Sequence, residues 1–144
     1  MVIFRCELES SFDAVDKTVI TATTLIKEKF IFMSERYLFN INFMLREILN
    51  NAVEHGNHFD KNKKVICEIE YIVPSLFFKI SDEGEGIKPE VILTEQYDPK
   101  SLLRERNRGH QTIIDMDFDI KLKGTQVIII LNLSQEERLW KNNY

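Results

Sequence analysis

The spacing of apolar residues changes after the loop that follows residue 54, and this change limits what the chain can fold into. Between about residues 12 and 54, apolar residues recur every three or four positions, which predicts two helices that each bury one face. From residue 65 onward, apolar and polar residues alternate, which predicts strands with one buried face. Two helices followed by strands in one short chain favour a layer of helices packed on a sheet.

Each helix has a start signal and an apolar stripe. Ser10 and Ser11 are candidate N-caps for a helix from about Phe12 to Phe30, and Ser34 for one running to about Glu54. Gly56 stands where the C-cap of the second helix is expected. The first stripe is Phe12, Val15, Val19, Ala22, Ile26 and Phe30, and the second is Leu38, Ile41, Leu45, Ile48 and Ala52.

The strands are expected at 2–8, 65–73, 76–82 and in a hairpin that turns at Lys123 and Gly124 and ends at 133. A long loop follows residue 82, with one helical turn near 101–104 and a short helix over 110–117. The polar tail after residue 133 is compatible with a helix, but its sequence does not place it in the fold. The whole chain, 1–144, is expected to be one α/β (α+β) two-layer sandwich, with a mostly antiparallel sheet and helices on one face.

Composition narrows the class of protein. The net charge of −4 argues against a nucleic-acid-binding role, because no basic surplus exists to displace counterions from phosphates. Two cysteines without a CxxC motif suggest reduced thiols in a cytoplasmic protein. Arg5 and Glu7 interrupt the first apolar run, which is therefore not a signal peptide, and no apolar run approaches the roughly 20 residues of a membrane span.

Four short stretches could carry chemistry, and the first lies on the second predicted helix. Glu47, Asn51 and His55 follow one another at one-turn intervals. The Asn51 amide oxygen suits Mg²⁺ when phosphate and water supply the other ligands. Glu47 beside it could take a proton from an attacking hydroxyl or water. A solvated helix face is the ordinary explanation of such a pair.

The second stretch is "DEGEG", which follows a predicted strand. Asp82 could accept a hydrogen bond from the amino group of adenine, and Gly84 and Gly86 would let the backbone approach a flat base. The third, "RNRGH", places Gly109 before a helix, where backbone N–H groups bind phosphate. Basic residues in the preceding loop could cover those phosphates; they are Lys100, Arg104, Arg106 and Arg108.

The fourth stretch is "KGTQV", which opens the last strand. Taken singly, "DEGEG" and "KGT" are ordinary turns and "RNRG" an ordinary solvated loop. The order and spacing of the four stretches, taken together, indicate one site. Together they resemble the GHKL ATPases, the Bergerat-fold superfamily of gyrase-type topoisomerases, heat-shock chaperones, mismatch-repair ATPases and histidine kinases.

The resemblance implies a role for each stretch. "EILNNAVEHG" resembles the N box, with Glu47 as general base and Asn51 at the Mg²⁺ position. "DEGEG" resembles the G1 box. The resemblance implies that Asp82 binds the adenine amino group and that Gly84, Gly86 and Ile87 also contact the nucleotide. "RGH" and "GTQV" resemble the later boxes, with Gly109 near phosphate and Thr125 near the Asp82–adenine contact. The implied ligands are ATP and Mg²⁺, bound also by Lys100, Arg104 and Arg108.

Within the superfamily, "NAVEHG" resembles the small bacterial anti-sigma-factor serine/threonine kinases. That resemblance implies binding of a sigma factor, phosphorylation of a small antagonist protein, and a homodimer. The G2-type stretch departs from the usual pattern, with Asn107 in place of a glycine and His110, Gln111 and Thr112 in place of apolar residues. Two alternatives therefore stay open: a nucleotide-binding module that sequesters a partner with little catalysis, and a detached histidine-kinase-like ATPase domain.

Overall fold

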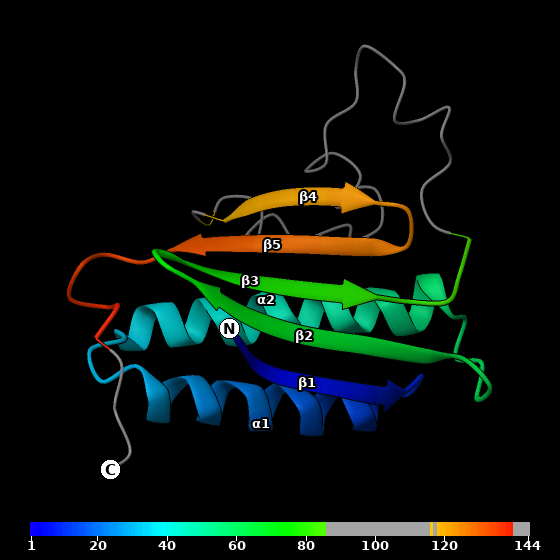
Figure 1. Cartoon of the computed structure of the whole chain (residues 1–144). Helices are drawn as coiled ribbons and strands as arrows, with labels where there is room; N and C mark the ends of the chain where they lie inside the picture. The colour runs from blue at the N-terminus through cyan, green and yellow to red at the C-terminus, as the bar shows by residue number, and fades with distance from the viewer. Residues whose placement is uncertain (86–115, 117, 140–144) are drawn as a thin grey trace.

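The computed structural model describes residues 1–85, 116 and 118–139. Five antiparallel strands form one sheet in the order β1-β2-β3-β5-β4. Helices α1 and α2 lie side by side against one face of that sheet (Figure 1). This is the predicted two-layer α/β sandwich, and the apolar core lies between the layers. Within the described residues, no helix is long and apolar enough to cross a membrane.

The elements agree with the sequence expectations to within a residue or two, apart from the end of α2. They are β1 (Val2–Glu9), α1 (Phe12–Lys29), α2 (Glu35–Asn51), a π-helical turn η1 (Ala52–Gly56), β2 (Lys64–Ile72), β3 (Ser75–Ser81), β4 (Asp119–Lys123) and β5 (Gln126–Asn132). The helical turn expected near 101–104 and nearly all of the helix expected over 110–117 fall outside the described residues.

Of the three candidate N-caps, Ser11 and Ser34 are confirmed, whereas Ser10 is not a cap and its hydroxyl donates to the Lys63 carbonyl. The Ser11 hydroxyl accepts a hydrogen bond from the Ala14 N–H, and the Ser34 hydroxyl accepts one from the Tyr37 N–H, each at 3.1 Å. The two apolar stripes are buried as predicted with one clear exception. Phe12 is exposed, because the ring at this first helical position packs edge-on against Phe59 rather than into the core.

The expected end of α2 is wrong in detail. Regular α-helix stops at Asn51, and the chain then makes a π-helical turn through Gly56. The Asn57 N–H closes this turn on the Ala52 carbonyl at 2.8 Å, so Asn57, not Gly56, follows the helix as its cap. Short π-helical segments are frequent at functional sites, because the wider turn changes where the following residues point.

Cys6 and Cys67 lie directly opposite each other on β1 and β2. Both are free thiols, as the sequence suggested. Burial, with the neighbouring Cys6 as a smaller contribution, raises the pKa of the Cys67 thiol to about 12. Cys67 is therefore an uncharged core residue.

Candidate functional site

Two of the three residues in the predicted polar line, Glu47 and Asn51, lie on α2, whereas His55 lies in η1. Glu47 is partly exposed, whereas Asn51, one turn later, is 6 % exposed. The Asn51 side-chain nitrogen has no hydrogen-bond partner in the described structure. A buried amide N–H left unpaired costs about 1–3 kcal/mol, so this donor fits a ligand oxygen or a bound water.

The turn after β3 places Asp82 at the end of the sheet nearest the end of α2 (Figure 1). Its backbone N–H donates to the Thr125 carbonyl at 3.3 Å, which brings Thr125 beside it as the resemblance implied. Its carboxylate oxygen Oδ1 accepts the Gly84 N–H at 2.8 Å. This local bond fixes the carboxylate, and a carboxylate has further acceptor sites for a ligand.

Gly56 and Gly84 let the helix end and the turn come together. A Cβ atom at Gly56 would lie 2.3 Å from Oδ2 of Asp82, and one at Gly84 would lie 2.3 Å from the Gly56 carbonyl oxygen. Neither position has room for a side chain. A pocket of about 220 Å³ opens at this contact, lined by His55, Gly56, His58, Lys63, Asp82, Gly84 and Glu85.

The comparison with protein families identifies the domain. Residues 10–129 match the family described as the histidine kinase-like ATPase domain. The chain belongs to this family. The match includes both α2 and the Asp82 turn, and it confirms the resemblance to the GHKL superfamily. A search of curated proteins found no match.

A histidine kinase-like ATPase domain binds ATP, and the described residues supply part of such a site. Glu47, Asn51, Asp82, Gly84 and Thr125 all lie within the described structure. The other predicted ligand-binding residues lie outside it, and these are Gly86, Ile87, Lys100, Arg104, Arg108 and Gly109. The described residues include no group of three or more His, Cys, Asp or Glu side chains able to hold a metal ion.

Asn57 is a residue of this ATPase domain that sequence reasoning missed. Its side chain is 1 % exposed and makes three hydrogen bonds. Nδ2 donates to the Ser10 hydroxyl at 3.0 Å and to the Lys64 carbonyl at 3.1 Å. Oδ1 accepts the Glu83 N–H at 2.8 Å. Asn57 therefore ties the end of η1 to the start of α1, to β2 and to the Asp82 turn.

Only a weak signal in the sequence could have identified Asn57. It follows Gly56 in a polar, turn-rich stretch, where asparagine is common for local reasons. Its partners are 7, 26 and 47 residues away, and no short-range pattern reveals them. The Glu83 carboxylate adds a second link, because it accepts the Lys64 N–H at 2.6 Å.

Proposed function

We propose that this ATPase domain is a protein serine/threonine kinase that uses ATP and Mg²⁺ to phosphorylate a small antagonist protein. The observation that carries the proposal is the pairing of Glu47 with the buried Asn51 one turn later on α2. These are the residue types that a proton acceptor and a Mg²⁺ ligand need.

The residues present fit ATP and Mg²⁺. The unpaired side-chain nitrogen of Asn51, at the end of α2, needs a hydrogen-bond acceptor. The Asn51 side-chain oxygen would hold Mg²⁺, and its N–H would donate to a phosphate or water oxygen. The other Mg²⁺ ligands would be phosphate and water oxygens, as is usual for this ion. The Asp82 carboxylate, already held by the Gly84 N–H, would accept a hydrogen bond from the amino group of adenine.

Glu47 supplies the proton transfer in the proposed step. It accepts the proton of the acceptor serine or threonine as that hydroxyl oxygen bonds to the γ-phosphorus of ATP. The bond from this phosphorus to the bridging oxygen breaks, and ADP leaves with the electron pair. Most of the rate enhancement would come from positioning and charge neutralisation.

The proposed partners follow from the resemblance to anti-sigma-factor kinases. They are a sigma factor and the antagonist protein that is phosphorylated, with the kinase acting as a homodimer in the cytoplasm. The acidic balance of the chain, −4, supports a protein partner over direct contact with nucleic acid.

Labelled phosphate transfer tests the proposal. Purified protein is incubated with γ-labelled ATP, Mg²⁺ and candidate antagonist proteins, and the product is tested for acid stability. We expect an acid-stable phosphoserine or phosphothreonine. Glu47→Gln should lower the rate by about 10²–10⁴-fold with ATP binding retained. Glu54→Gln, the same change at the next glutamate along the chain, which is exposed, is the matched control and should leave the rate unchanged.

Two other outcomes would favour the alternatives. ATP binding without transfer to any candidate would support a partner-sequestering module, which the unusual "RNRGHQT" stretch favours. An acid-labile phosphohistidine product would support a detached histidine-kinase-like ATPase domain. Either result would refute the serine/threonine kinase.

A further inference from the structure

Strand β1 lies at one end of the sheet, and within the described residues no strand pairs with its outer edge. A groove of about 500 Å³ runs beside this edge, between β1 and α1. Residues 6–9 of β1 form one side of the groove, and Asp13, Ala14, Lys17 and Thr18 of α1 lie on the other. An extended peptide can add a strand to an exposed sheet edge of this kind.

The pairing of β1 with β2 determines which main-chain groups reach the free edge. The Met1 amino group donates to the Tyr71 carbonyl at 2.9 Å, and the Tyr71 N–H donates to the Met1 carbonyl at 2.8 Å. Main-chain bonds to one neighbour come from every second residue of a strand, so Cys67, four residues before Tyr71 on β2, also faces β1. Its partner Cys6 therefore bonds back to β2.

Arg5 and Glu7, on either side of Cys6, direct their N–H and C=O groups away from β2 and toward the groove. The Glu7 carbonyl accepts a weak hydrogen bond from the Cys6 thiol at 3.6 Å, which a main-chain N–H could replace. Further along, the Glu9 carbonyl already accepts the Ser11 N–H at 2.8 Å. The stretch of β1 that can pair with an added strand is therefore centred on Arg5 and Glu7.

The charge of the groove indicates the chemistry of such a strand. The lining has three carboxylates, Glu7, Glu9 and Asp13, and one ammonium group, Lys17. All four side chains are exposed, so each can meet a ligand charge without a large cost of desolvation. The excess of carboxylates favours a basic ligand.

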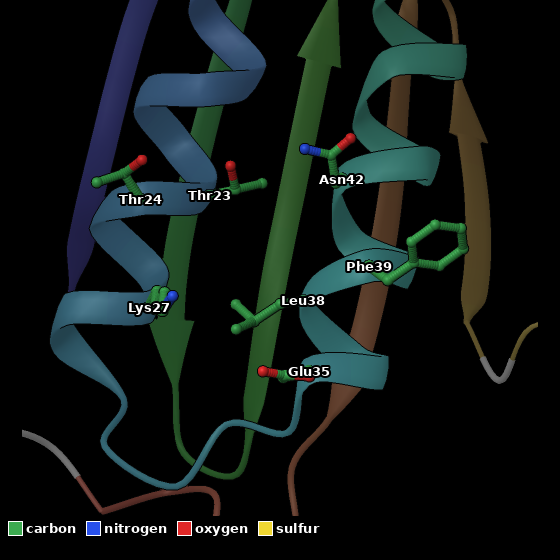
Figure 2. A pocket seen from close by; sticks show the side chains of 7 residues that line it. All are labelled: Thr23, Thr24, Lys27, Glu35, Leu38, Phe39 and Asn42. Atoms are coloured by element: carbon green, nitrogen blue, oxygen red, sulfur yellow. The ribbon is translucent and has the colours of Figure 1, made fainter.

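A second groove, between α1 and α2, gives no such indication. It has a volume of about 350 Å³, and Figure 2 shows one side chain of each charge in its lining, Lys27 on α1 and Glu35 on α2. Helices bond their own main-chain groups, so this groove offers no free edge. Free main-chain groups and an excess of one charge occur together in the groove beside β1.

The two faces of an added strand would meet different surroundings. Cys6 and Leu8 of β1 pack against the helix layer, whereas Glu7 and Glu9 alternate with them and point to the other face of the sheet. Side chains of an added strand alternate in the same way. Small apolar side chains suit the helix side, beside Ala14, and Lys or Arg side chains suit the side of the two glutamates.

We propose that an extended basic segment of a partner protein, with Lys or Arg alternating with small apolar residues, binds along β1 as a sixth strand. Its main chain pairs with Arg5 and Glu7, and its basic side chains lie beside Glu7 and Glu9. A second copy of the chain fits less well. Paired strands are about 4.8 Å apart, but packed helices need about 8–10 Å. Because α1 runs beside β1 (Figure 1), two copies paired through β1 would bring their α1 helices too close.

Peptide binding to the whole chain, without nucleotide, tests the proposal. The probes are two fluorescein-labelled peptides, Lys-Val-Lys-Val-Lys-Val and Glu-Val-Glu-Val-Glu-Val, and binding is measured by fluorescence anisotropy. We expect the lysine peptide to bind at least about tenfold more tightly. Absence of binding of the lysine peptide, or equal binding of the two peptides, would overturn the proposal.

Two variants at one position separate strand pairing from charge. Glu7→Gln removes the carboxylate and keeps the N–H, and we expect roughly twofold to threefold weaker binding of the lysine peptide. Glu7→Pro removes the same charge together with the N–H at the free edge, which the ladder to β2 does not use. It should weaken binding by at least about tenfold. Equal effects of the two substitutions, in protein shown to be folded by urea denaturation, would contradict strand pairing.

Amide hydrogen exchange in the wild-type protein gives a readout that needs no variant. The Arg5 and Glu7 N–H groups should exchange rapidly in the free protein and severalfold more slowly with the lysine peptide bound, whereas Cys6 and Leu8 should be protected in both states. Slow exchange at Arg5 and Glu7 before the peptide is added, or no slowing afterwards, would overturn the proposal. The measurement involves neither ATP nor phosphate transfer, so its failure would leave the proposed kinase activity untouched.

Discussion

Replacement of Asn57 by alanine should both destabilise the domain and weaken ATP binding. The side chain lies at the junction of η1, β2 and the Asp82 turn, and nothing in an alanine can replace its amide. The Asp82 carboxylate itself is untouched by the change. Any loss of ATP affinity in the folded variant would therefore come from a displacement of the Asp82 turn.

The magnitude follows from three hydrogen bonds at 2.8, 3.0 and 3.1 Å, made by a side chain that is 1 % exposed. A typical net contribution is about 1 kcal/mol for each bond, so Asn57→Ala should lower the free energy of unfolding by about 3 kcal/mol. Loss of the bond to the Glu83 N–H frees the residue next to Asp82. We expect about tenfold weaker ATP binding, equivalent to about 1.4 kcal/mol.

Urea denaturation gives the free energy of unfolding, and calorimetry gives the ATP dissociation constant under conditions where the variant stays folded. Ser75→Ala is the control. Ser75 begins β3, at the end of the strand away from Asp82, and its hydroxyl donates one hydrogen bond of 2.5 Å to Asn132 on β5. It should cost about 1 kcal/mol and leave ATP affinity unchanged. An Asn57→Ala variant as stable as Ser75→Ala, with wild-type ATP affinity, would refute the reasoning.

Four further outcomes follow from the structure. Gly56→Ala should abolish ATP binding measured by calorimetry, because its Cβ would lie 2.3 Å from the Asp82 carboxylate; retained affinity would contradict the close contact. Gly124→Ala should lower the free energy of unfolding by about 1 kcal/mol in urea titration, because φ is +60° there although a Cβ has open space. In native protein near neutral pH, iodoacetamide should label Cys6 and spare Cys67, whose pKa is raised to about 12, as read by mass spectrometry. The stability that uncharged Cys67 contributes should be complete below its ordinary pKa of 9.0 and be lost as pH rises toward 12, because the unfolded chain releases this proton first.

Local signals in the sequence were sufficient for most of the fold. The caps Ser11 and Ser34 and the alternation in β2 are contained in a few neighbouring residues, and each was predicted correctly. The π-helical turn after Asn51 was missed, because an α-helical and a π-helical turn have nearly the same apolar spacing over five residues. Phe12 was placed in the core because it fits the stripe, but its burial depends on what lies beyond the helix end.

The candidate site could be predicted only where its residues lie in short motifs. Glu47 and Asn51 are one turn apart, and Asp82 and Gly84 are two residues apart, so each pair lies within one short motif. Each motif alone had an ordinary explanation, and the joint order of the motifs and their resemblance to the GHKL ATPases indicated the site. The close contact of Gly56 with Asp82 and Gly84 was not predictable, because tertiary structure brings these residues together from distant parts of the sequence. Asn57 was missed for the same reason, since all three of its side-chain partners are brought to it by tertiary structure.

The position of β1 affects where this domain can be cut. The family match begins at residue 10, after β1 has ended at Glu9. Yet β1 pairs along nearly all of β2 and places Leu8 in the core. A fragment trimmed to the matched residues would leave β2 as an unprotected edge, open to pairing with other chains. The part of the chain that must be expressed together to stay folded and monodisperse is therefore longer than the part that matches the family.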